Sequence, residues 1–231
     1  MAPDKAFEIT VAPRFYATVV SVDDARVDPI FTPMGGMTIG ARLGRFPNWD
    51  IAVTGLYGKG DSDFRDKDED TRGDARFSRT DFEALLRYRI PDTSLYVFFG
   101  PRYVRGRQAL DHSGTNGRER YVTHLYMAEV GGGFAHSIDE AGRHSVFANI
   151  TAGVGHSRTS ARTNLVGYPV YNSDGAAFLG DLNIGYQYAF NSFFTLSGRY
   201  RLINVHIDNQ AEEKIGRNIV QGIEFAGTFR F

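Results

Sequence analysis

The sequence predicts an all-β fold: a closed antiparallel transmembrane β-barrel of about ten strands, with short turns at one end and longer loops at the other. Apolar and polar residues alternate with a period of two, and the connections alternate between short and long. No run approaches the roughly 18–20 apolar residues of a membrane-crossing helix. The 231-residue chain is 42% hydrophobic with a mean hydropathy of -0.30. These values do not exclude a barrel, which hides its apolar residues at every second position.

The last segment shows the alternation most clearly. Odd positions from Ile219 to Phe231 are mostly apolar or aromatic and even positions are small or charged, and successive side chains of a strand point to opposite faces. The same pattern predicts strands at 7–20, 34–45, 49–61, 77–90, 94–107, 119–136, 144–157, 175–190, 193–207 and 217–231. Short turns are expected at 46–48, 91–93, 139–143 and 191–192, and long polar loops at about 21–33, 62–76, 108–118, 158–174 and 208–216.

The strand count and the connections define the expected organisation of the chain. An even number of strands places both termini at the short-turn end. No linker or low-complexity segment divides the sequence, so residues 1–231 are expected to form a single domain. Residues 1–4 lead directly into the first strand-like run, and we interpret the chain as a mature form whose signal peptide has been removed.

The polar face of the predicted strands contains both glycine and charge. Glycine weakens strands, so a water-facing surface has no reason to favour it, whereas a crowded interior does. The charges nearly balance and the cations are arginines, whose guanidinium groups suit desolvated ion pairs. We therefore expect these charges inside the barrel and the aromatic face in lipid; the alternative is a soluble sandwich with an aromatic core. The expected lumen network is Arg14, Arg42, Glu83, Arg87, Arg102, Glu129, Asp181, Arg199, Arg201 and Glu224, on the same face as Glu8, Asp50, Asp81, Arg89 and Arg230.

Composition excludes several other classes of protein. The 26 basic and 27 acidic residues give a net charge of -1, without the basic excess typical of proteins that bind nucleic acid. The chain has no cysteine, so it can form neither disulfides nor thiolate metal sites. The acidic segment 61–74 lacks the ligand spacing of an EF-hand. We expect no metal and no cofactor.

The C-terminal segment 224–231 carries the clearest resemblance. Its alternating aromatics, ending in Phe229 and Phe231, resemble the assembly signal of bacterial outer-membrane β-barrel proteins, although Ala226 stands at the usual glycine position with Gly227 beside it. The resemblance identifies the class and no specific family within it. It implies an outer-membrane location with the short turns in the periplasm. It also implies contact with membrane lipid and lipopolysaccharide, and insertion by the barrel-assembly machinery.

Two polar pairs lie at predicted strand ends, Asp61 with Asp63 and His206 with Asp208. They are similar to the Asp pair and Asp/His pair at the extracellular rim of omptin proteases, which are also ten-stranded barrels. A carboxylate beside an imidazole can activate water as a general base. The His-x-Asp order here reverses the Asp-x-His order of that family, and acids at a rim are also ordinary solvated loop residues.

A second hydrolase comparison concerns His156 and Ser157. Lipid A deacylases use a His/Ser/Glu set on the lipid-facing surface of a barrel. Adjacent residues of a strand point to opposite faces, so this histidine and this serine cannot meet directly.

The interior charges define the remaining functional alternatives. A wide lumen of one sign would select ions, whereas a narrow lumen with paired charges cross-links its walls. We expect a closed lumen and a structural or surface-interaction protein that acts through its outer loops, whose extracellular ligand the sequence does not identify. The alternative is a narrow channel for small solutes or ions, and the third possibility is a hydrolase at the rim.

Overall fold

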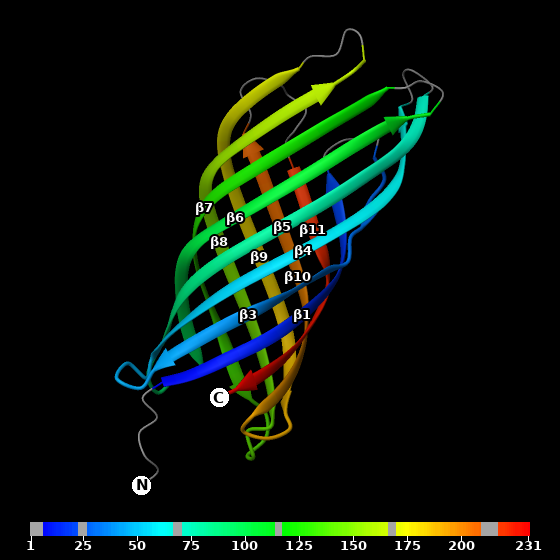
Figure 1. The fold of residues 1–231 in the computed structure, drawn as a ribbon. Helices are drawn as coiled ribbons and strands as arrows, with labels where there is room; N and C mark the ends of the chain where they lie inside the picture. Colours follow the sequence, from blue (N-terminus) through cyan, green and yellow to red (C-terminus); the bar gives the residue numbers. More distant parts are fainter. Residues whose placement is uncertain (1–6, 23–26, 67–70, 114–116, 166–169, 209–216) are drawn as a thin grey trace.

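The chain folds into a closed antiparallel barrel (Figure 1). The computed structural model describes residues 7–22, 27–66, 71–113, 117–165, 170–208 and 217–231. The strands are β1 (Phe7–Val22), β2 (Ile30–Phe31), β3 (Met34–Leu43), β4 (Trp49–Asp66), β5 (Thr71–Arg89), β6 (Leu95–His112), β7 (Arg118–Ser137), β8 (His144–Thr163), β9 (Tyr171–Ala189), β10 (Phe194–Asp208) and β11 (Arg217–Arg230). Among the described residues, no helix long and apolar enough to cross a membrane is found.

Ten strands form the barrel wall, as the alternation predicts. β2 and β3 both pair with β1 and are separated only by Thr32 and Pro33, so together they occupy one position in the wall. Starting at Ile9 and stepping from each residue to its partner on the next strand, one passes once around the barrel. The path returns to β1 at Ser21, so the strands are staggered by twelve residues in one turn of the barrel. This stagger tilts the strands by about 40° and leaves an interior narrow enough for side chains to fill.

The large apolar side chains point outward, as predicted. Phe225 and Tyr186 are 50% and 42% exposed, and comparable side chains surround the barrel, including Phe15, Ile51 and Ile150. A continuous band of exposed aromatic and aliphatic side chains is unfavourable in water and favourable in the hydrocarbon region of a bilayer. The barrel therefore spans a membrane, and the soluble-sandwich alternative is wrong.

The strands are longer than predicted at the long-loop end. β4 to β6, β8 and β9 extend into the expected loops 62–76, 108–118 and 158–174, and β2 lies in the expected loop 21–33. In these extensions the outward positions are polar, as at Arg76 and Arg158, whereas the inward positions hold both apolar residues such as Ala75 and Ala161 and buried polar residues such as Thr159. Water replaces lipid outside the barrel at this height. The extensions therefore form a stem, the part of the barrel beyond the membrane, in the upper part of Figure 1.

The short turns at the opposite end are held by side-chain acceptors. The backbone N–H groups of His144 and Arg143 donate to the Asp139 carboxylate at 2.7 and 3.1 Å. These hydrogen bonds stabilise the ionised carboxylate and so lower the pKa of Asp139 below its usual value. The bond from His144 has the largest effect. Asn191 accepts from the N–H groups of Phe193 and Phe194 in the next turn. Each turn thus returns the chain directly into the next strand.

Candidate functional site: the filled lumen and its rim

A network of paired charges crosses the lumen in the membrane-spanning part of the barrel. Its centre is Arg102 on β6, whose side chain is fully buried. The guanidinium group of Arg102 lies 2.6 Å from Asp81, 3.2 Å from Asp181, 3.5 Å from Glu129 and 3.8 Å from Glu83. One arginine thus holds carboxylates from β5, β7 and β9 together.

Further arginines balance this cluster of carboxylates. Arg201 pairs with Asp181 and lies 3.7 Å from Glu83 and 3.9 Å from Glu224. Arg14 and Arg199 bind Glu224, and Arg79 donates to Asp81 at 3.1 Å. The network contains five arginines and five carboxylates, so it carries no net formal charge. These residues are Arg14, Arg79, Arg102, Arg199, Arg201, Asp81, Glu83, Glu129, Asp181 and Glu224.

Two of these ion pairs cross the lumen of the barrel. The pair of Arg201 and Glu83 connects β10 to β5, which are five wall positions apart in a barrel of ten. The pair of Arg102 and Asp181 connects β6 to β9. Because these links pass through the middle of the lumen, the charged side chains occupy the cross-section and do not merely line it.

The remaining predicted lumen residues lie closer to the short turns. Arg87 donates to Asp50 at 2.8 Å, and Arg89 lies 3.5 Å from the same carboxylate. The buried Nε atom of Arg42 has no hydrogen-bond partner among the described residues. Arg79 was absent from the predicted lumen network, although it lies two positions before Asp81 on the same strand face.

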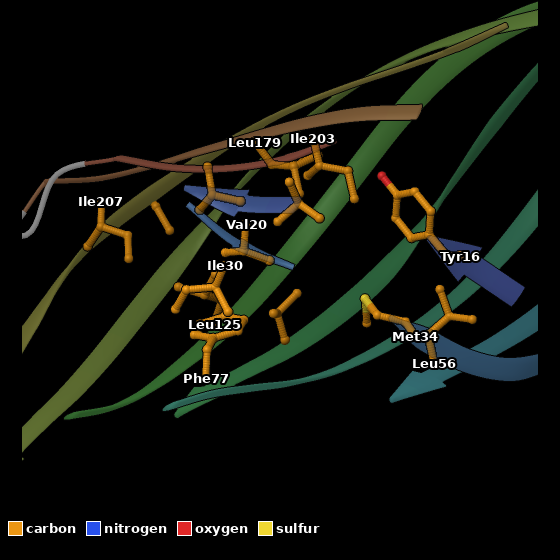
Figure 2. Close-up of a cluster of buried hydrophobic side chains, with 14 of the residues drawn as sticks. Tyr16, Val20, Ile30, Met34, Leu56, Phe77, Leu125, Leu179, Ile203 and Ile207 are labelled. Atoms are coloured by element: carbon orange, nitrogen blue, oxygen red, sulfur yellow. The ribbon is translucent and has the colours of Figure 1, made fainter. Parts of the chain in front are cut away.

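A layer of apolar side chains fills the lumen directly above the charged network, on the long-loop side. Along the strands, Val104 follows Arg102 by two residues, Ile203 follows Arg201, and Leu179 precedes Asp181. The cluster is Tyr16, Val20, Val27, Ile30, Met34, Leu56, Ala75, Phe77, Val104, Leu110, Leu125, Met127, Ala177, Leu179, Ile203, Val205, Ile207 and Val220. Figure 2 shows these side chains meeting from β1, β2, β5, β7, β9 and β10.

This apolar layer differs from the prediction, which was a polar interior along the whole barrel. Consecutive apolar residues such as Phe178-Leu179 and Leu202-Ile203 mark heights at which both faces of a strand are apolar. These pairs could have indicated a layer with lipid outside and a dry core inside. The hydroxyl group of Tyr16 donates to the backbone oxygen of Arg201 at 3.0 Å and joins the two layers.

A buried polar cluster lies inside the stem, beyond the apolar layer. Nε2 of His112 and Oε1 of Glu119 are 2.8 Å apart, and the Tyr121 hydroxyl donates to Glu119 Oε2 at 2.5 Å. The side chains of His112 and Glu119 are both 2% exposed. This cluster was not predicted, since residues 108–118 were expected to form a loop.

The candidate catalytic residues are not brought together. Asp61 and Asp63 lie on β4 and His206 and Asp208 on β10, and β3, β1 and β11 separate these strands on the shorter way around the barrel. All four residues are exposed and occupy outward positions of their strands. Among the described residues, no group of three or more His, Cys, Asp or Glu side chains could hold a metal ion.

His156 and Ser157 point to opposite faces, as expected for neighbours in a strand. Nε2 of exposed His156 is 3.4 Å from Asp174, whereas the buried Ser157 hydroxyl donates to the backbone oxygen of Gly175. This histidine therefore cannot activate this serine.

The C-terminal aromatics lie at the short-turn end, where the last strand closes the barrel. The N–H of Phe231 donates to the backbone oxygen of Ile9 at 2.9 Å. The Phe229 ring lies 5.0 Å from that of Phe194, and Phe231 packs edge-on against Phe193 at 5.2 Å. These rings form part of an aromatic girdle at the edge of the apolar band.

A ten-stranded antiparallel barrel with a lipid-facing apolar band, short turns at one end and an extended stem at the other is a bacterial outer-membrane β-barrel. The short turns then face the periplasm and the stem faces the exterior. Solved structures share this fold. The outer-membrane protease OmpT from Escherichia coli has a TM-score of 0.60 and 11% identity, over 99% of this chain and 98% of that one.

Two autotransporter domains are similar as well. The translocator domain of NalP from Neisseria meningitidis has a TM-score of 0.58 and 11% identity, over 100% of this chain and 90% of that one. The transport unit of AIDA-I from Escherichia coli has a TM-score of 0.51 and 9% identity, over 100% and 92%. No family model and no curated protein matches the sequence. At these identities the likeness establishes a shared fold and leaves activity open.

Proposed function

We propose that this protein is a closed outer-membrane barrel that acts as a structural and surface-interaction protein through its extracellular stem and loops. The observation that carries the proposal is the double filling of the lumen, by a balanced charge network and by the apolar layer above it. A solute would have to break paired charges and then pass through a layer that offers it no hydrogen bonds.

The two layers oppose permeation by different means. Separating a buried ion pair leaves each charge without compensation at low dielectric constant, which is costly. The apolar layer adds a hydrophobic constriction, and such constrictions exclude water and ions. The alternative, a narrow channel for small solutes, needs a continuous polar path, which the apolar cluster interrupts.

The stem supports the surface-interaction part of the proposal. Because the strand extensions are hydrogen-bonded into the barrel wall, they hold an outward surface in place beyond the membrane. Outward side chains such as Arg76, Arg107 and Arg158 are exposed to water at this height. A surface of this kind suits contacts with extracellular partners.

Conductance in planar lipid bilayers tests the proposal. We expect no steady single-channel steps from the reconstituted protein, under conditions in which a known porin conducts. The double variant Arg201→Ala/Ile203→Ala removes one side chain from each layer and is expected to show measurable openings. Steady steps from the unmodified protein would support the channel alternative and contradict the closed barrel.

A further inference from the structure

A hollow on the wall of the stem is not explained by the closed lumen. It has a volume of about 560 Å³ and lies over β4, β5, β6 and β7. Nine of its thirteen lining residues occupy outward positions of their strands, so the hollow opens on the outside of the barrel. Its lining includes Tyr57, Lys59, Arg76, Arg107 and Arg120.

The hollow is strongly basic. Four of its lining residues are cations, and Asp61 is the single carboxylate among them. Arg76 shares the carboxylate of Asp111 with Arg118. Within the described part of the chain, Lys59, Arg107 and Arg120 form no ion pair, and all three are exposed. A concave surface in which three of the four cations lie outside any ion pair attracts anions, above all phosphates, which arginine can bind through two hydrogen bonds.

The hollow lies at the upper edge of the membrane band. Tyr57, 55% exposed, is the last large apolar outward residue of β4, and Lys59 is the next outward residue. On β6, outward Tyr103 is followed in the same way by Arg105 and Arg107. Two residues along a strand span about 7 Å. Lys59 thus lies about 7 Å beyond the lipid-facing band, whereas Arg107, four residues beyond Tyr103, lies about 13 Å and Arg120, six residues beyond Tyr126, about 20 Å along its strand. A ligand that fills the hollow therefore reaches the lipid-facing band at the Tyr57 end and the arginines further out.

We propose that this hollow binds the phosphorylated sugar headgroup of an acylated lipid of the outer leaflet, the lipid A part of lipopolysaccharide. Its phosphates pair with Lys59, Arg107 and Arg120, while its acyl chains lie along the apolar band below Tyr57. A soluble phosphate would use only the basic half of this surface. The site lies on the outer wall, so it does not depend on whether the lumen is closed.

Titration of the detergent-solubilised protein with bisphosphorylated lipid A, followed by native mass spectrometry, tests the site. We expect the double variant Arg107→Gln/Arg120→Gln to bind about a hundredfold more weakly, about tenfold for each arginine removed. The matched control is Arg143→Gln, an exposed arginine in a turn at the opposite end, which should bind as the unmodified protein does. Lipid A stripped of its phosphates should bind weakly to all three proteins.

Three outcomes would overturn the proposal. The first is a folded double variant that binds lipid A as tightly as the unmodified protein does. The second is dephosphorylated lipid A that binds as tightly as bisphosphorylated lipid A. The third is displacement of lipid A by millimolar inorganic phosphate, which would indicate that the hollow binds a soluble anion instead. If the double variant does not fold, Lys59→Gln, at an exposed position on a different strand, provides the same comparison. Bilayer conductance is independent of this result, so failure of the lipid site and failure of the closed barrel can be told apart.

Discussion

Replacing Arg102 by methionine is expected to destabilise the folded barrel by about 3–5 kcal/mol. Methionine keeps much of the side-chain volume and removes the charge, so that the carboxylates of Asp81, Asp181 and Glu129 are left facing one another in the lumen. Urea-induced unfolding in lipid vesicles, followed through the fluorescence of the single tryptophan, Trp49, measures the loss.

The matched control is Arg143→Met, at an exposed turn position, which should change the free energy of unfolding by less than about 0.5 kcal/mol. Adding Asp81→Asn and Asp181→Asn to the Arg102 variant should restore part of the stability, because the repulsion between carboxylates falls. A loss below about 1 kcal/mol for Arg102→Met would mean that the network does not hold the walls together.

Replacing Gly100 by alanine is expected to destabilise the barrel by about 1–3 kcal/mol or more. A Cβ atom at Gly100 would lie 1.9 Å from the backbone oxygen of Ala84 on the neighbouring strand. A backbone oxygen cannot move aside as a flexible side chain can, so β5 and β6 would have to separate. The same unfolding measurement applies.

Gly180→Ala is the control, because a Cβ atom there meets nothing within 4 Å. This variant should be neutral or more stable by about 0.5–1 kcal/mol, since alanine loses less conformational freedom on folding than glycine. Equal stabilities of Gly100→Ala and Gly180→Ala would show that the close approach of β5 and β6 is not needed.

Much of the fold could be predicted because lipid and lumen impose opposite polarities on alternate residues. The ten-stranded wall, the order of the strands and the outward position of Phe225 and Tyr186 follow from this alternation and from the lengths of the connections. The turn-end strand boundaries agree closely with prediction, because Phe46-Pro47-Asn48 and Asn191-Ser192 interrupt the pattern sharply.

The other strand boundaries could not be predicted from the same rule. Beyond the membrane, water replaces lipid, so the outward positions become polar and the apolar/polar alternation is lost. Polar runs that suggested loops are therefore strands of the stem. Where the membrane-spanning part of the barrel meets the stem, both faces of the strands are apolar, and Leu179 and Ile203 fill the lumen. The meeting of Arg102 and Asp181, 79 residues apart, depends on barrel closure, which no local pattern contains.

Cysteine accessibility tests most directly the claim that apolar residues meet lipid outside and a dry, filled lumen inside. The chain has no cysteine, so single substitutions can be compared by their rates of alkylation in vesicles. We expect Arg158→Cys on the stem to react with a membrane-impermeant maleimide, Ile223→Cys to react only with a lipid-soluble one, and Ile203→Cys to resist both. Alkylation of Ile203→Cys by the impermeant reagent as fast as Arg158→Cys would contradict the account.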